Sequence, residues 1–401
     1  MINGSRQAVN YPQRSPTIMI KPNYHDGSIV NLVASIGRGL GAANAYEPLP
    51  LLPPETVTEA RNVVLLIIDG LGHDFLQRHP GHLARHIQGR ITSVFPSSTA
   101  PAISSLVTGV APQQHGVTGW FMQFREFGTV GMILPYRPRY SPFPFDSKQL
   151  PVENLLGQPS FFDGLEIKSY YLMHHQLVDS AYSIMAAGTA QRQDYHGLSD
   201  LFGNLVRIAR KDANGKYIYA YWPMFDALAH RYGVDSEIVD DHFQQIDQEF
   251  QHCVEALAGT DTLLIITADH GFIDTAPRQT LRLEHYPDIQ ECLSLPLCGE
   301  PRVAYCYVHH NRAADFERLV LEQLGHGVEL HRAEDLVAGD WFGLGTPSSR
   351  LLERVGDYVL ICKDNHVIKD RLPMEQRWHD TGVHGGVSAR EMYVPLLTVH
   401  C

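Results

Sequence analysis

The pattern of hydrophobic residues predicts three buried strands, and each strand is followed by a carboxylate. The runs are NVVLLIID at residues 62–69, YIYAYWPMFD at 217–226 and DTLLIITADHG at 261–271. Apolar runs of this length are typical of strands covered on both faces. The carboxylates at or just beyond their ends are Asp69, Asp226 and Asp269.

One long helix is predicted between the second and third of these strands. Apolar residues recur at helical spacing along one face of residues 234–257, at Val239, Phe243, Ile246, Phe250, Cys253 and Leu257. A strand, a helix and a strand in this order indicate parallel strands joined by a right-handed crossover. Parallel sheets bind ligands beyond the carboxyl ends of their strands. We therefore expect the three carboxylates to meet at one edge of a sheet.

Histidines follow the same strands at spacings that suit metal binding. His230 comes four residues after Asp226, which places both on one face of a helical turn, and His270 adjoins Asp269. His384 precedes two glycines and a strand-like run near the C-terminus. Crowded carboxylates raise one another's pKa, so a cation among them is the economical arrangement. Each pair alone is a weak signal, but their joint occurrence indicates a metal site.

The stretch FPSSTAPAISSLVTG at residues 95–109 predicts a helix that begins close to Thr99. Ser97, Ser98 and Thr99 are all acceptable N-caps, and Pro101 suits the first turn. Taken alone, this pattern is typical of a capped helix without any further role.

The composition indicates a globular protein and argues against duplex nucleic-acid binding, membrane association and a disulfide framework. The 401 residues, 44% of them hydrophobic, suffice for one large α/β domain with an insertion or for two domains. A net charge of −12 with scattered basic residues argues against a duplex nucleic-acid partner. No apolar run suits a membrane span or signal peptide, and the 6 cysteines lack CxxC spacing. We therefore expect a cytoplasmic protein with reduced thiols and no membrane association; the oligomeric state stays open.

The motifs together resemble the alkaline phosphatase superfamily, and most closely its type I phosphodiesterase/nucleotide pyrophosphatase family. The matching segments are LLIIDGLG, FPSSTAPAISSLVTGVAPQQHGVTGW, FDALAHRYG, IITADHGF and VHGG. The resemblance implies an α/β three-layer sandwich with a mostly parallel central sheet and a small α/β cap insertion. It also implies a metal-dependent phosphohydrolase that acts on a small phosphorylated substrate, as a phosphodiesterase or nucleotide pyrophosphatase.

The resemblance further implies a centre of two divalent metal ions. Carried over by position, one ion is bound by Asp69, Thr99, Asp269 and His270, and the other by Asp226, His230 and His384. Thr99, which lies ten residues before Gly109, matches the nucleophile that forms a phosphothreonine intermediate. The family implies zinc, although nitrogen and oxygen ligands also suit manganese or iron.

Trp120 marks a departure from the family. Nucleotide pyrophosphatases carry an Asn at this point after the HG element, where it donates a hydrogen bond to the phosphate. Either Trp120 packs under the cap and another donor serves the phosphate, or it lines the substrate-binding pocket. In the second case it favours an apolar group beside the phosphorus, and hence a diester.

The same motifs suggest how the chain is divided. We expect an N-terminal extension over 1–48, a catalytic core over 49–289 and 376–401, and a cap-like insertion over 290–375. The segment GDYVLICKDNHVI at 356–368 is expected to return from the cap toward the core.

Alternative functions remain open at this point. Phosphonate hydrolases and phosphomonoesterases or phosphotransferases of the superfamily use closely related sites. A non-catalytic nucleotide-binding module is conceivable from the glycines after Asp69, but Phe75 occupies the third glycine position of that motif. Sulfatase chemistry is disfavoured because no Cys or Ser stands in the Cys/Ser-x-Pro-x-Arg setting of those relatives.

Overall fold

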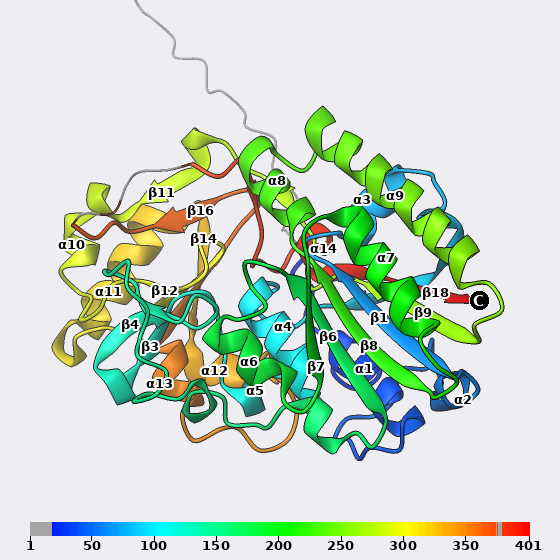
Figure 1. Cartoon of the computed structure of the whole chain (residues 1–401). Helices are drawn as coiled ribbons and strands as arrows, with labels where there is room; N and C mark the ends of the chain where they lie inside the picture. The colour runs from blue at the N-terminus through cyan, green and yellow to red at the C-terminus, as the bar shows by residue number, and fades with distance from the viewer. Residues whose placement is uncertain (1–17, 374, 376–378) are drawn as a thin grey trace, which may run out of the picture.

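The computed structural model describes residues 18–373, 375 and 379–401, and a large sheet lies at its centre (Figure 1). Its seven strands, in order across the sheet, are β2 (Ile87–Thr92), β18 (Tyr393–His400), β9 (Thr262–Thr267), β1 (Asn62–Ile68), β8 (Lys216–Trp222), β6 (Lys168–His174) and β7 (Gln191–Tyr195). Only β18 runs antiparallel to its neighbours in this sheet. Residues 1–17 of the predicted extension and 376–378 of the predicted core lie outside the described residues.

The three predicted strands are confirmed, and they are direct neighbours. Strand β1 pairs in parallel with β8 on one side and with β9 on the other, and every residue of the three strands is buried. Two-sided burial accounts for their continuous apolar sequences. The segments that follow the three strands therefore emerge side by side at one edge of the sheet.

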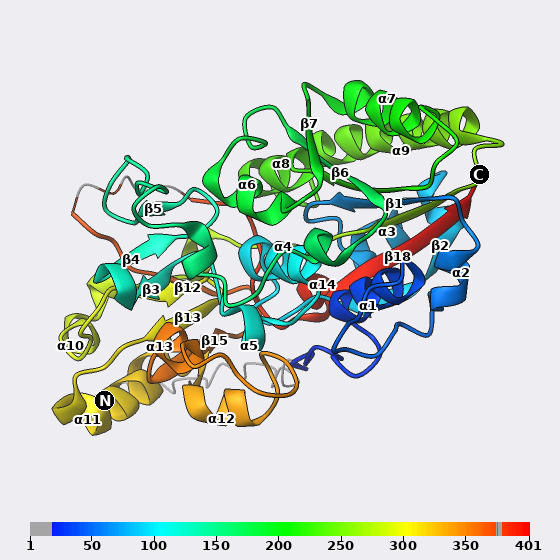
Figure 2. The same cartoon turned by 60° about the horizontal axis from the view of Figure 1, so that its bottom comes forward.

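Helices cover both faces of the central sheet, as Figure 2 shows. The helices are α1 (Ile29–Gly39), α2 (Pro54–Thr58), α3 (His73–Arg78), α4 (Thr99–Thr108), α5 (Pro112–His115), α6 (Ala181–Ala187), α7 (Leu198–Ala209), α8 (Met224–Tyr232), α9 (Glu237–Leu257), α10 (Pro287–Gln290), α11 (Ala313–Leu319), α12 (Ala333–Ala338), α13 (Leu351–Val355) and α14 (Ala389–Met392). Helices α7, α8 and α9 lie on one face and α1, α4 and α6 on the other. All six apolar positions predicted to face the core along α9 are buried.

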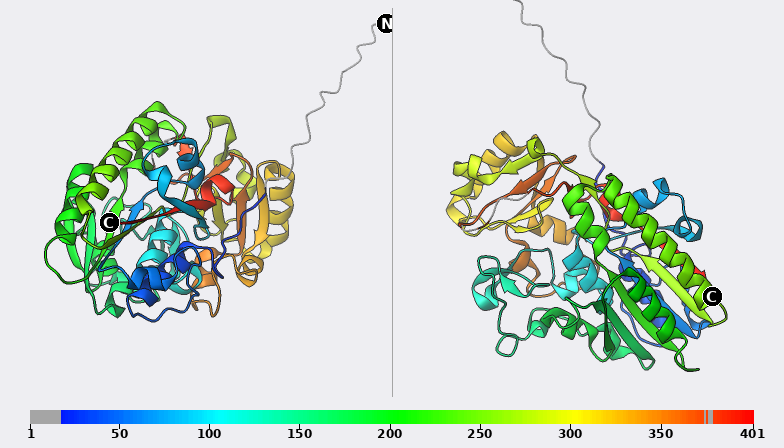
Figure 3. Two further views of the ribbon diagram at one scale, coloured as in Figure 1. Left: turned by 90° about the vertical axis from the view of Figure 1, so that its right-hand side faces the viewer. Right: turned by 45° about the horizontal axis from the view of Figure 1, so that its top comes forward.

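A smaller antiparallel sheet lies beside the central sheet (Figure 3). Its strands, in order, are β12 (Cys298–Gly299), β13 (Val303–Cys306), β15 (Tyr358–Cys362) and β14 (Val328–Arg332). Their buried residues form hydrophobic clusters separate from the main core. Strand β15 thus belongs to the small sheet, whereas Val367 and Ile368 pair with Thr280 and Leu281 of the predicted core. The expected return of 356–368 toward the core stays a prediction.

The remaining strands of the described residues form three short sheets. They pair β3 (Met122–Phe124) with β4 (Thr129–Met132) and β5 (Arg137–Pro138), β10 (Ile273–Asp274) with β17 (Gly382–Val383), and β11 (Thr280–Arg282) with β16 (Val367–Lys369). Helix α1 packs within the main core, although its residues fall in the segment predicted to be an N-terminal extension. The division into extension, core and cap stays a prediction.

Among the described residues, no helix combines the length and hydrophobicity needed to cross a membrane.

Candidate metal centre

The carboxylates that follow β1, β8 and β9 meet at the edge of the central sheet. Asp69 comes directly after β1, Asp269 comes two residues after β9, and Asp226 lies in the first turn of α8. Gly70 makes the sharp turn after Asp69 with a φ of +77°, and a Cβ there would lie 2.5 Å from the Phe272 ring. The turn therefore requires glycine.

One group of candidate ligands consists of Asp69, Asp269 and His270, and all three are buried. The Nε2 atom of His270 lies 3.3 Å from Asp69 Oδ1 and 3.4 Å from Asp269 Oδ2. Thr99 Oγ1, at the start of α4, lies 3.1 Å from the same Nε2 atom. The structure thus brings together the four residues predicted to bind the first metal.

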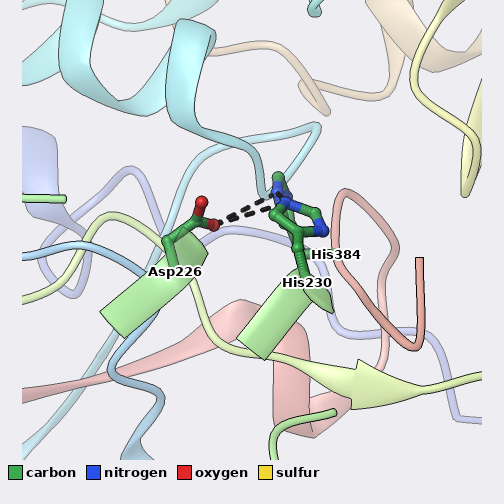
Figure 4. A group of neighbouring side chains, drawn as sticks. All are labelled: Asp226, His230 and His384. Atoms are coloured by element: carbon green, nitrogen blue, oxygen red, sulfur yellow. Dashed lines mark hydrogen bonds and ion pairs between the residues drawn. The ribbon is translucent and has the colours of Figure 1, made fainter. Parts of the chain in front are cut away.

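The second group consists of Asp226, His230 and His384 (Figure 4). Asp226 Oδ1 lies 3.5 Å from His230 Nε2 and 3.7 Å from His384 Nε2, and the two Nε2 atoms are 3.1 Å apart. Asp226 Oδ1 also lies 3.9 Å from His270 Nε2 in the first group. The two groups are therefore contiguous, as a centre of two ions requires.

Two backbone carbonyls orient the histidines for metal binding. His230 Nδ1 lies 2.9 Å from the carbonyl of Gly382, and His270 Nδ1 lies 3.1 Å from that of Gly271. A carbonyl can only accept a hydrogen bond, so Nδ1 carries the proton and Nε2 of the neutral ring keeps a lone pair. Burial lowers the pKa of His230, and burial together with His270 lowers that of His384. The nitrogen atoms that face the carboxylates are therefore suitable ligands.

Within the described residues, no Lys or Arg offsets the charge of the three carboxylates. Burial, and then the charge of Asp226, raises the pKa of Asp69 well above its usual value. Burial raises the pKa of Asp226 to about 7 and, together with Asp69, that of Asp269 to about 8. One buried oxygen of each has no hydrogen-bond partner among the described residues, and no Lys or Arg there forms an ion pair with them. A bound cation would satisfy these oxygens, so the residues fit a metal.

The three consecutive hydroxyls at residues 97–99 contact three different parts of the chain. Ser97 Oγ donates to the carbonyl of Gly386 at 2.6 Å, two residues beyond His384. Ser98 Oγ donates to Glu300, and Thr99 contacts His270. The helix begins at Thr99 as predicted, but Ser98, at the N-cap position, makes no side-chain capping bond. The hydroxyls connect the start of α4 to the candidate site.

Trp120 reaches this region through its backbone. Its N–H donates to Glu300 Oε1 at 2.7 Å, and the next residue, Phe121, forms a bridge with Gly299. The side chain of Trp120 is partly exposed. Its predicted role in substrate binding stays a prediction.

Sequence reasoning missed two residues that contact the site. The Tyr221 hydroxyl donates to Asp69 Oδ2, and the alternation of tyrosines along β8 could have placed it on the face toward the site. Glu300 contacts Ser98 and Trp120, but no motif surrounds it in the sequence. Burial raises its pKa to about 7 despite these hydrogen bonds.

Residues 63–386 match the family described as type I phosphodiesterase/nucleotide pyrophosphatase. This range contains all the candidate ligands, Thr99 and Trp120.

Solved structures with a similar fold include murine ectonucleotide pyrophosphatase/phosphodiesterase 5, at 17% identity and a TM-score of 0.66 over 84% of this chain and 87% of that one. An inactive variant of the same murine protein in complex with AMP matches at 18% identity and a TM-score of 0.64, with the same coverage. Phosphonoacetate hydrolase from Sinorhizobium meliloti 1021, in complex with phosphonoacetate, matches at 16% identity and a TM-score of 0.61 over 85% and 90% of the two chains. These likenesses confirm the expected alkaline-phosphatase-like α/β fold with a mostly parallel central sheet.

Proposed function

Because the chain belongs to the type I phosphodiesterase/nucleotide pyrophosphatase family, a family of metal-dependent phosphoric ester hydrolases, we propose that it hydrolyses a small phosphodiester with Thr99 as nucleophile. The observation that carries this proposal is the position of Thr99. Its hydroxyl lies at the start of α4 and 3.1 Å from His270 of the first group, and His270 in turn lies 3.9 Å from Asp226 of the second.

The proposed centre holds two divalent ions, most consistent with zinc. Asp69, Thr99, Asp269 and His270 would hold one ion, and Asp226, His230 and His384 the other. The nitrogen and oxygen donor set also suits manganese or iron. When bound, such ions act as Lewis acids that lower the pKa of a hydroxyl and offset charge on a phosphoryl group.

The protein's own residues support a displacement in two steps. In the first, Thr99 Oγ1 attacks the phosphorus, the bond to the leaving alcohol breaks, and a phosphothreonine ester forms. The N–H groups of Thr99 and Ala100, at the start of α4, would favour the negative charge of a phosphoryl group on Thr99. In the second step, water attacks the same phosphorus, the bond to Thr99 breaks, and the threonine hydroxyl is restored.

The proposed substrate is a small diester with an apolar or planar group beside the phosphorus. Trp120 stands at the position of the family's Asn, and an indole contributes a broad apolar surface with one N–H donor. The structural neighbours were solved with AMP and with phosphonoacetate, which supports a small phosphorylated ligand. A cytoplasmic location is part of the same proposal, because all 6 cysteines are free thiols.

A substrate screen with metal-loaded and chelated protein tests the proposed function. The substrates are an aryl phosphodiester, the matching aryl monoester, a dinucleoside pyrophosphate and phosphonoacetate. We expect the diester to be hydrolysed fastest, with activity lost on chelation and restored by zinc. Faster hydrolysis of the monoester or of the phosphonate would replace the diesterase assignment, and full activity after chelation would overturn the metal mechanism.

A further inference from the structure

Glu300 lies where three segments of the candidate site meet. Its carboxylate accepts hydrogen bonds from Ser98 Oγ and from the Trp120 N–H, the latter at 2.7 Å. It also packs against Gly385, where a Cβ would lie 2.9 Å from Glu300 Cβ and where φ is +101°. Each partner is a predicted site residue or is adjacent in sequence to one. Glu300 itself comes from the turn between β12 and β13 of the small sheet.

The hydrogen bond to Glu300 changes what Ser98 does for α4. Serine at an N-cap ordinarily accepts a hydrogen bond from an N–H of the first helical turn. Here the Ser98 side chain instead donates to Glu300 and makes no capping bond. Pro101 has no N–H, so Ala100 carries the N–H that an N-cap side chain would accept, and without that cap it is available to another acceptor. The proposed acceptor is the phosphoryl group transferred to Thr99, the residue next to Ser98.

Burial makes this arrangement rigid. Glu300 is only 6% exposed and Ser98 only 1% exposed. The Trp120 bond and the bridge between Phe121 and Gly299 hold the neighbouring loop to the same turn of the small sheet. A buried carboxylate with two donors fixes its neighbours more firmly than an exposed one, because solvent does not compete for the same bonds.

We propose that Glu300 is a positioning residue: through its hydrogen bond with Ser98 it holds the start of α4, and with it Thr99, in line with the substrate. The inference rests on the proposed role of Thr99. Because Glu300 lies in the 290–375 segment, this segment would influence the rate of phosphoryl transfer directly, in addition to any contact that it makes with substrate.

Three substitutions separate this role from a general structural one. Glu300→Ala removes both hydrogen bonds, Glu300→Gln keeps an oxygen that accepts both, and Ser98→Ala removes only the link to α4. Asp247→Ala is the matched control, since Asp247 is a buried carboxylate of α9 that accepts two backbone N–H bonds, from His82 and Leu83. Metal content and melting temperature are measured for each variant alongside kcat and KM for an aryl phosphodiester.

We expect Glu300→Ala and Ser98→Ala to lower kcat by on the order of tenfold to 100-fold with KM nearly unchanged, because misplacement of a reacting group acts on the chemical step. Glu300→Gln restores most of the rate, and Asp247→Ala lowers the melting temperature without lowering kcat. A normal kcat in Ser98→Ala overturns the inference, even if Glu300→Ala does not fold. So does equal loss in Glu300→Gln and Glu300→Ala.

Thr99→Ala, assayed in parallel, distinguishes a failure of the inference about Glu300 from a failure of the proposed function. If Thr99→Ala is inactive while Ser98→Ala is normal, the inference about Glu300 fails and the proposed function stands. If Thr99→Ala is as active as the parent, the proposed function fails, and the inference fails with it.

Discussion

The hydroxyl oxygen of Thr99 lies 3.1 Å from Nε2 of His270, which joins the start of α4 to the end of β9. The two residues are 171 positions apart in sequence, and one strand, β18, separates β2, which precedes α4, from β9 in the sheet. The fold therefore places the hydroxyl of Thr99 beside the imidazole of His270, which also faces the carboxylate of Asp269.

Replacing Thr99 by alanine should abolish turnover and leave the fold intact. The side chain is not the N-cap of α4, so we expect a loss of stability below about 1 kcal/mol. Loss of a nucleophile lowers kcat by several orders of magnitude. Thr108→Ala is the control, because Thr108 ends the same helix and bonds only the Ser104 carbonyl there. Near-normal kcat in Thr99→Ala with an inactive Ser97→Ala would show that the nucleophile was placed wrongly.

Replacing His384 by alanine should remove one ion and retain the other. Its ring belongs to the group with Asp226 and His230, whereas Asp69, Asp269 and His270 form the other group. Elemental analysis should therefore fall from about two ions per chain to about one. His242→Ala, which removes a histidine bonded to Trp222, should retain both. Loss of both ions, or of neither, would contradict the assignment of two groups.

The sequence was sufficient to predict three central strands and the clustering of the candidate ligands that follow them. Unbroken apolar runs occur only where both faces of a strand are covered, and the positions of Asp69 and Asp269 follow from where those runs end. Glu300 could not be found in this way, because its role depends on which segments pack together, whereas the alternation of tyrosines along β8 is a signal for Tyr221. Glu300 is 202 residues from Ser98 in the sequence, and only the position of the small sheet joins them.

The small sheet contains part of the segment 356–368. The run YVLIC in that segment is as apolar as β1, so its sequence does not reveal which sheet it joins. In the structure it pairs with β13 and β14, and its neighbours in space come from the same insertion.

Chelated protein should lose stability as the pH rises. Burial raises the pKa of Asp226 to about 7 and of Asp269 to about 8, from an ordinary value of 3.8. Between these values the folded state binds more protons than the unfolded state, so the free energy of unfolding falls as pH increases. A bound cation compensates the ionised carboxylates and removes most of this fall.

Melting temperatures of loaded and chelated protein between about pH 5 and about pH 8 check this expectation. The difference between the two forms should widen with pH, and chelated Asp269→Asn should show a smaller decline than the chelated parent. A difference that stays constant or narrows would contradict the account of the carboxylates.

Replacing Trp120 by asparagine should shift substrate preference toward nucleotides. The substitution supplies the amide donor that the family carries at this position and removes the apolar ring, while the backbone bond to Glu300 can persist. We expect a lower kcat/KM for an aryl diester and a higher one for a dinucleoside pyrophosphate. Trp222→Phe, on β8, serves as a control for loss of an indole. An unchanged ratio in Trp120→Asn would show that Trp120 does not contact the reacting group.

The stereochemical course at phosphorus tests the two-step displacement through Thr99 most directly. A phosphodiester made chiral at phosphorus by sulfur substitution is hydrolysed in water enriched in heavy oxygen, and the configuration of the product is determined. Each in-line displacement inverts the phosphorus, so attack by Thr99 followed by attack of water gives net retention. The account predicts retention. Inversion would mean that water attacks the substrate in a single step, and would contradict a covalent intermediate on Thr99.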